Sequence, residues 1–274
     1  MSEPSTSSSD EERPLDQQRP HSARVWDYWL GGKSNYQVDR EAGDQIQQVL
    51  PDVAEAARAD RGFLIRSVRH LTAEAGIRQF LDLGAGLPTN HNTHEVAQNL
   101  APKSRVVYVD NDPLVLRYAE ALLTSGPLGA TNYVDADVRD VEAILEQAAK
   151  TLDFTRPLAV MMLGIVQFII DDDQARDVVR RFVEAVPSGS YLVLAHPLKN
   201  VSSELDRVVQ MWNDAGVDPQ TLRDPADVAG YFDGLELLEP AVVPCAQWRP
   251  DHADIGNHRT AAPWRVCAVG RKPY

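Results

Sequence analysis

The chain has 274 residues, with 27 Lys and Arg against 40 Asp and Glu, which gives a formal net charge of −13 at pH 7. This acidic balance argues against a general basic surface for nucleic acid or an anionic membrane. The longest apolar stretch, Leu158 to Ile170, is too short for a bilayer span, and the N-terminus lacks the regions of a signal peptide. We therefore predict a cytoplasmic protein with neither nucleic-acid nor membrane partners.

Composition divides the chain into three regions. Residues 1–20 are mostly Ser, Glu, Asp, Pro and Gln, so they bury too little apolar surface to offset their ordering entropy and are predicted to be a disordered tail. Residues 21–75 are predicted to be mainly helical: apolar and aromatic residues precede Gly31-Gly32, and Pro51 suits the first turn of a helix that ends before Gly76. Residues 76–274 are predicted to form an α/β domain.

Strands and helices are predicted to alternate from residue 77 onward. The near-continuous apolar strands indicate a mainly parallel sheet that is covered on both faces. Two final segments without a helix between them, 235–246 and 264–269, predict an antiparallel hairpin that completes a doubly wound seven-stranded sheet. The other predicted strands are 77–83, 105–110, 130–134, 158–163 and 191–195, and the helices are 93–100, 112–125, 141–150, 172–186, 204–215 and 225–232.

A glycine turn follows the first predicted strand and indicates a nucleoside site. Gly84 and Gly86 allow a tight turn and close backbone approach, and Asp110 ends the next strand, where a carboxylate can accept both ribose hydroxyls. A pyrophosphate-binding turn would continue with a third glycine, but Thr89 stands there after Pro88, which lacks an amide donor. S-adenosylmethionine, which carries no phosphate, therefore fits better than NAD or FAD.

Polar residues end the other predicted strands, and ligands of open α/β sheets bind at these carboxyl ends. Asn111 is expected to cover the adenine face, Asp137 to accept from the adenine amino group, and the Val138 amide to serve a ring nitrogen. Asp137 has an alternative role as a helix N-cap. Leu163 and Gly164 end the fourth predicted strand and complete the predicted cofactor site.

Several motifs resemble those of the actinobacterial S-adenosyl methyltransferase family, which was formerly a domain of unknown function. The matching motifs cover nearly the whole chain after the tail, and they are Ala23-Arg-Val-Trp-Asp-Tyr-Trp-Leu-Gly-Gly-Lys-Ser-Asn, Ala57-Arg-Ala-Asp-Arg-Gly-Phe-Leu, Gly76 to Thr89, Val106-Val-Tyr-Val-Asp-Asn-Asp-Pro and Ser188-Gly-Ser-Tyr-Leu-Val-Leu-Ala-His. The resemblance implies a class I methyltransferase fold, a helical N-terminal cap at residues 21–75 and S-adenosylmethionine as cofactor.

The resemblance also implies roles for single residues. The first loop would be formed by Gly84, Ala85, Gly86 and Thr89, and the methionyl end would be approached from the cap by Tyr28, Gly31, Gly32 and Asn35.

The methionine carboxylate needs a cation, for which Arg58 is the first candidate and Arg24 the second. Alternatively, Arg58 is an ordinary helix residue that faces solvent. Trp26 and Trp29 either line an acceptor pocket or anchor the N-terminal segment.

This chain departs from the family pattern at two positions. Gln167 stands where the family has His, so a family mechanism that uses a base there is in doubt, and Asp60 stands where the family has Asn. His196 at the end of the fifth strand is the best-placed candidate base, with a loop-capping role equally open. His91 and His94 lack a third ligand, and no metal site is predicted.

Three functions remain open at this level. The first is a methyltransferase that acts on a small-molecule acceptor, and the second is a catalytically silent protein that binds S-adenosylmethionine as a sensor or regulator. The third, a nicotinamide oxidoreductase, is disfavoured by Pro88 and Thr89. The sequence predicts neither the acceptor nor the methylated atom, and it leaves the oligomeric state open.

Overall fold

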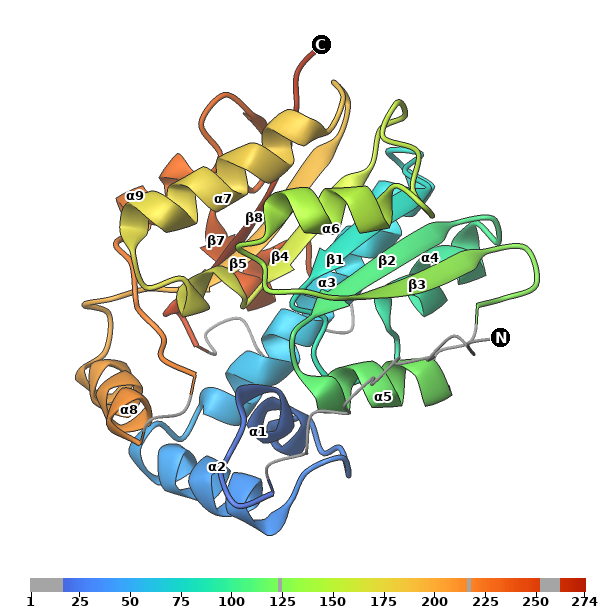
Figure 1. Cartoon of the computed structure of the whole chain (residues 1–274). Coiled ribbons are helices and arrows are strands. Elements are labelled where there is room, and N and C mark those ends of the chain that lie inside the picture. The colour runs from blue at the N-terminus through green and yellow to red at the C-terminus, as the bar shows by residue number, and fades with distance from the viewer. Residues whose placement is uncertain (1–16, 123–124, 216–217, 252–261) are drawn as a thin grey trace, which may run out of the picture.

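The computed structural model describes residues 17–122, 125–215, 218–251 and 262–274 (Figure 1). Most of the predicted tail, residues 1–16, lies outside this part of the chain, as do 252–261. Among the described helices, none combines the length and the apolar composition that a bilayer crossing requires.

One mixed sheet forms the centre of the molecule, in the strand order β3-β2-β1-β4-β5-β8-β6. The first five strands pair in parallel, and β8 pairs antiparallel with β5. This confirms the predicted doubly wound class with antiparallel C-terminal strands. The parallel strands are β1 (Gln79–Leu83), β2 (Arg105–Asp110), β3 (Ala130–Asp135), β4 (Ala159–Leu163) and β5 (Tyr191–Pro197).

The C-terminal strands differ from the predicted hairpin. β8 (Arg265–Arg271) is a full strand, but the segment 235–246 contributes only the two short strands β6 (Glu236–Leu237) and β7 (Val243–Pro244), both antiparallel to β8. The described sheet therefore has eight strands instead of seven. Pro240 and Pro244 explain the break, because proline cannot donate a hydrogen bond to a continuous ladder.

Helices cover both faces of the sheet, and each face has its own core (Figure 1). α6 (Val141–Ala148) and α7 (Asp172–Ala185) lie on one face, where Ile144, Val178 and Phe182 are buried against the strands. α3 (Val53–Ala73) and α4 (Thr93–Leu100) lie on the other, where Phe63 and Leu71 are buried. The remaining helix beside the strands is α5 (Pro113–Leu122), which contacts β3.

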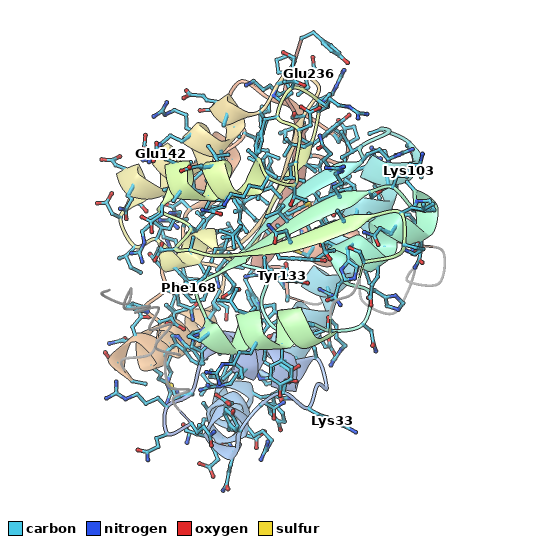
Figure 2. The ribbon with its side chains drawn as sticks, turned by 45° about the vertical axis from the view of Figure 1, so that its right-hand side comes forward. Lys33, Lys103, Tyr133, Glu142, Phe168 and Glu236 are labelled. Atoms are coloured by element: carbon cyan, nitrogen blue, oxygen red, sulfur yellow. The ribbon has the colours of Figure 1, made fainter. Side chains whose placement is uncertain are left out.

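A helical layer lies beyond the carboxyl ends of the parallel strands (Figure 1). It contains α1 (Ser22–Trp29) and α2 (Gln37–Val49), together with α8 (Ser203–Asp214). From here on, the cap means α1 and α2 with the segments beside them, because α3, the last part of the predicted cap at residues 21–75, packs on a face of the sheet. Val25 and Ile46 of the cap pack with Trp212 of α8 and with the first turn of α3. Residues 37–49 lie within the region predicted to be mainly helical, although few of their side chains are buried. Figure 2 shows Lys33 at the cap end and Glu236 at the opposite end of the molecule. The final helix, α9 (Pro225–Gly230), precedes β6.

Candidate functional site

A cavity of about 330 Å³ lies at the carboxyl ends of the parallel strands, beneath α1. The strand order reverses between β1 and β4 at this place, which is where open α/β sheets bind ligands. Most of the predicted cofactor-binding residues line this one cavity: Gly84, Ala85, Gly86, Thr89, Asp110, Asn111, Asp137, Val138, Leu163 and Gly164.

The glycine turn after β1 forms one wall of the cavity. Gly84 has φ +73° and Gly86 has φ +63°, a region that favours glycine. A Cβ atom on Gly84 would lie 2.8 Å from the side chain of Ile165, whereas one on Gly86 would meet nothing within 4 Å. The turn therefore needs glycine at position 84 for packing as well as for conformation, and Gly86 leaves open space for a ligand.

Asp110 at the end of β2 is held by two backbone amides. Its Oδ2 accepts from the Gly86 amide at 2.9 Å, and its Oδ1 accepts from the Asp112 amide at 3.0 Å. Burial raises the pKa of Asp110, although the two amide donors oppose this effect. The carboxylate is thus fixed in direction at the strand end, with lone pairs left to accept hydroxyl donors.

Asp137 follows β3 and pairs with a neighbour along the chain. Its Oδ1 accepts from the Arg139 amide at 2.9 Å and from Arg139 Nε at 2.7 Å. The hydrogen bond from the Arg139 side chain is the main cause that lowers the pKa of Asp137. Asp140, and not Asp137, is the N-cap residue of α6. Asp137 therefore does not have the alternative role of N-cap of α6.

Two charged residues at the base of the cavity had no role in the sequence analysis. Asp82 on β1 is buried and accepts from Thr93 Oγ1 at 2.6 Å, and burial raises its pKa to about 6. Arg61 on α3 also lines the cavity, and its Nε atom is buried without a hydrogen-bond partner in the described part of the chain. Burial lowers the pKa of Arg61. A buried guanidinium edge beside the cavity can receive an anion.

The structure places neither predicted carboxylate-binding arginine at the cavity. Arg58 lies one turn before Arg61 on α3, is exposed and is not among the lining residues. Arg24 is buried in the cap, where its Nε lies 2.9 Å from Asp39 Oδ2. The helix turns Arg58 toward solvent and Arg61 toward the cavity.

The predicted cap residues lie behind the cavity wall instead of on it. Asn35 Nδ2 donates to Asp27 Oδ2 at 2.8 Å, and a Cβ atom on Gly32 would overlap the Asp27 side chain. Tyr28 donates to Asp44 at 2.7 Å on the cap surface. Asp27 itself lines the cavity, and Gly31 does not. Gly32 and Asn35 of the cap therefore pack around Asp27.

A buried ion pair joins α3 to β8 at the cavity. Arg265 of β8 donates from Nε and Nη2 to Asp60 at 3.2 and 3.1 Å, and from Nη1 to Gln167 Oε1 at 3.1 Å. Its guanidinium carbon lies 5.1 Å from the ring centroid of Trp26. All four side chains line the cavity, so Asp60 and Gln167, the two expected departures from the family pattern, belong to one network.

His196 lies in the core and does not line the cavity. Its Nδ1 lies 2.7 Å from the Pro197 carbonyl, and its Nε2 lies 3.0 Å from Arg223 Nη1. Burial lowers the pKa of His196 to about 3, so the ring is neutral near pH 7. A buried neutral ring with both nitrogens engaged is poorly placed to act on a ligand in the cavity.

Comparison with known proteins identifies the family. A family model described as S-adenosyl methyltransferase matches residues 8–273. The chain belongs to the S-adenosyl methyltransferase family. A protein of the DUF574 family from Streptomyces avermitilis is 44% identical, covers 95% of this chain and 100% of its own, and superposes with a TM-score of 0.91. An inferred methyltransferase from Thermobifida fusca is 39% identical over 93% of this chain and 96% of its own, with a TM-score of 0.86.

More distant structures agree in fold alone. An O-methyltransferase family protein from Burkholderia thailandensis is 16% identical, with a TM-score of 0.53 over 81% of this chain and 58% of its own. No curated protein matches the chain.

Membership of the S-adenosyl methyltransferase family confirms S-adenosylmethionine as the cofactor, and the chain is a methyltransferase that depends on it. The cavity fits such a nucleoside, because Asp110 offers a fixed carboxylate and Gly86 leaves space for close approach. The unpartnered Nε of Arg61 offers a site for a carboxylate.

Proposed function

We propose that this methyltransferase acts on a small-molecule acceptor that binds in the same cavity as the cofactor. The observation that carries the proposal is that residues of the glycine turn, the strand ends and α1 line one cavity. Its volume of about 330 Å³ suits small-molecule ligands, which bind in concave sites lined by apolar groups and a few directed polar groups.

The nucleoside part of the cofactor is assigned to the strand ends. Asp110 would accept the ribose hydroxyls, while Asn111 would cover the adenine face. Asp137 and the Val138 amide would serve the adenine edge, beside Leu163 and Gly164. The two amide contacts of Asp110 support this assignment, since a carboxylate held in one direction selects for paired hydroxyls.

The methionyl carboxylate is assigned to Arg61. Its position in the cavity lining and its unpartnered Nε support this role, while the exposed side chain of Arg58 does not. Gly32 and Asn35 would act through Asp27, whose Oδ2 is fixed by Asn35 and by the Ser34 amide at 2.9 Å. Asp27 is then the cap carboxylate that lines the cofactor cavity.

The acceptor is assigned to the wall formed by Trp26, Gln167 and Phe168. Figure 2 shows Phe168 between the sheet and the cap. Bound S-adenosylmethionine supplies a methyl group that is already activated by the sulfonium charge. The protein then has to orient the acceptor and exclude water, and positioning alone supplies up to about 7 to 11 kcal/mol of barrier reduction. Gln167 cannot exchange a proton near neutral pH, so this wall suits an acceptor that is readily deprotonated.

Label transfer tests the proposal. The protein is incubated with methyl-labelled S-adenosylmethionine and an actinobacterial metabolite extract that is divided by ultrafiltration into small and macromolecular fractions. We expect labelled product from the small-molecule fraction and none with an Asp110→Ala variant. Label in the macromolecular fraction alone would overturn the small-molecule acceptor. Tight binding of S-adenosylhomocysteine without transfer to either fraction would favour the sensor function. The reason to test that function is that His196, the predicted base, lies outside the cavity lining.

A further inference from the structure

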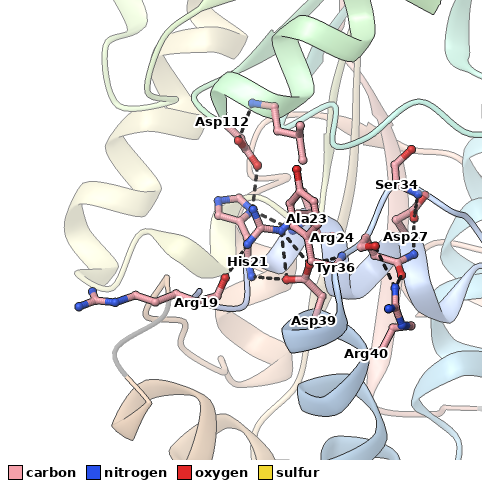
Figure 3. A network of polar contacts seen from close by, with 12 residues as sticks. Arg19, His21, Ala23, Arg24, Asp27, Ser34, Tyr36, Asp39, Arg40 and Asp112 are labelled. Atoms are coloured by element: carbon pink, nitrogen blue, oxygen red, sulfur yellow. Dashed lines mark hydrogen bonds and ion pairs between the residues drawn. The ribbon is translucent and has the colours of Figure 1, made fainter. Parts of the chain in front are cut away.

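We propose that His21 is a positioning residue that holds the cap over the bound cofactor. Deprotonation of its imidazolium to the neutral ring weakens the contact with Asp112 and speeds cofactor release. The proposal rests on the placement of the cofactor given above. Figure 3 shows His21 between Asp112 and the cap, in a network that includes Arg24 and Asp39. His21 precedes α1 and lines the cavity, and 28% of its side chain is exposed.

The His21 ring bridges two carboxylates from different parts of the chain. Its Nδ1 lies 3.0 Å from Asp112 Oδ2, in the loop after β2, and its Nε2 lies 3.4 Å from Asp218 Oδ2, in the segment after α8. Ser22 Oγ donates to the same Asp218 oxygen at 3.0 Å. One imidazolium thus joins the start of the cap to both sides of the cavity mouth.

The contacts of Nδ1 indicate a choice between two states. In the neutral ring with its lone pair on Nδ1, this atom accepts from the Ala23 amide at 3.3 Å and caps α1. When Nδ1 carries a proton, it can donate to Asp112 Oδ2, a buried oxygen that has no other donor among the described residues. Because an unsatisfied buried carboxylate oxygen is costly, protonation favours the contact with Asp112.

Asp112 connects this contact to the cofactor site. Its backbone amide donates to Asp110 Oδ1 at 3.0 Å, and Asp110 is the carboxylate assigned to the ribose. The Asp112 side chain also accepts from the Leu114 amide at 2.8 Å, at the start of α5. Holding Asp112 from the cap therefore fixes one of the two donors that orient Asp110.

The charges around His21 favour its protonated form. Burial opposes the charge, but the hydrogen bond and charge of Asp112, with the charge of Asp218, raise the pKa of His21 above its ordinary 6.5. Arg24 on α1 opposes this effect, and Asp39 on α2 pairs with Arg24 and accepts from the His21 amide at 3.0 Å. The contact is therefore present below pH 6.5 and is lost as the pH rises through the raised value.

Release of S-adenosylhomocysteine, measured by stopped-flow fluorescence between about pH 5.5 and 8.5, tests the proposal without any acceptor. For the wild type, we expect the dissociation rate to rise about fivefold with pH, the effect of one partly exposed ion pair. His21→Asn should release rapidly at every pH, because asparagine keeps the helix cap but does not titrate. Asp218→Asn should shift the transition to lower pH.

His91→Asn is the matched control and should behave as the wild type. His91 is exposed, lies outside the cavity lining and has φ +63°, which asparagine tolerates. A titration of His21 by NMR adds a measurement that needs no variant, since S-adenosylhomocysteine should raise the pKa of the ring by linkage.

Two results would count against the assignment in different ways. Release that does not depend on pH in the wild type, or an unchanged pH dependence in His21→Asn, would overturn the role of His21 alone. Absence of binding at every pH would overturn the cofactor placement on which this role rests.

Discussion

Arg58 and Arg61 show how a single turn of helix decides the role of a residue. Both belong to α3, and both are arginines within one motif of the sequence. Arg58 is exposed, whereas Arg61 lines the cavity and reaches the backbone of Asn90 from Nη2 at 3.0 Å. The motif predicted a cation from this helix, but which face meets the strand ends depends on packing that the motif does not contain.

Replacing Arg61 tests this difference. Arg61→Gln should weaken S-adenosylhomocysteine binding by roughly 30- to 150-fold, because a charge-assisted hydrogen bond contributes about 2 to 3 kcal/mol when buried. The measurement is isothermal titration calorimetry at neutral pH. Arg58→Gln is the matched control from the same helix and should bind as the wild type. Equal losses in both variants, or a loss in Arg58→Gln alone, would contradict the assignment, and thermal unfolding of each variant checks the fold.

The residues that sequence analysis could place share a simple origin. Asp110, Asp137 and Gly164 lie at or just after the ends of strands, and parallel strands bring their carboxyl ends to one edge of the sheet. Arg265 and His21 could not be found this way. Arg265 meets Asp60 across 205 positions of sequence, and His21 meets Asp112 through the position of the cap. Such contacts follow from tertiary packing alone.

At the scale of elements, the alternating strands and helices were predicted well because each has a strong local pattern. α4 and β2 begin and end as predicted, at Thr93–Leu100 and Arg105–Asp110. The segment 235–246 was predicted as one strand, which was wrong, because its apolar residues are interrupted by Pro240 and Pro244. Its short strands pair with β8, and β8 separates them from β5.

The turn after β1 should tolerate a Cβ atom at position 84 poorly, because Ile165 packs against it. Gly84→Ala should lower the thermal midpoint more than Gly76→Ala, although the two glycines have nearly equal φ values of +73° and +72°. Each substitution costs about 1 kcal/mol in backbone strain. An alanine at 84 must also displace Ile165, 2.8 Å away, which adds about 1 to 3 kcal/mol, while the same atom at 76 meets nothing within 4 Å.

Calorimetric unfolding of both variants measures the difference. Equal midpoints would mean that the turn yields without cost and that the contact with Ile165 does not fix its shape. Gly84→Ala should also weaken cofactor binding, since the turn supplies the Gly86 amide that holds Asp110.

At the scale of the whole molecule, buried charged and titratable groups connect parts that are distant in sequence. Asp60 and Arg265 join α3 to β8, and His196 joins β5 to Arg223, which also reaches the Val166 carbonyl at 3.1 Å. Breaking a buried ion pair by removing one partner usually costs about 3 to 5 kcal/mol. These contacts tie global stability to protonation as well as to packing.

The lowered pKa of His196 determines whether stability rises or falls with pH. The folded state holds the ring neutral, with its pKa lowered to about 3, while the unfolded chain takes up a proton below about pH 6.5. The unfolded state therefore binds more protons between these values, and stability falls as the pH decreases. Asp82 acts in the opposite direction between about pH 4 and 6, because its folded pKa is raised to about 6.

Comparison with His196→Gln isolates the histidine, because the Asp82 effect is common to both proteins and cancels. The variant should be less stable at about pH 7.5, where it loses a packed ring that hydrogen-bonds to Arg223. Its deficit should shrink by about 2 kcal/mol when the pH is lowered to about 5, since the wild type alone loses roughly 1.4 kcal/mol per pH unit below 6.5. Urea unfolding at the two pH values measures both free energies. A deficit that stays constant would mean that His196 accepts a proton in the folded state, which would require water to reach the core beside Arg223.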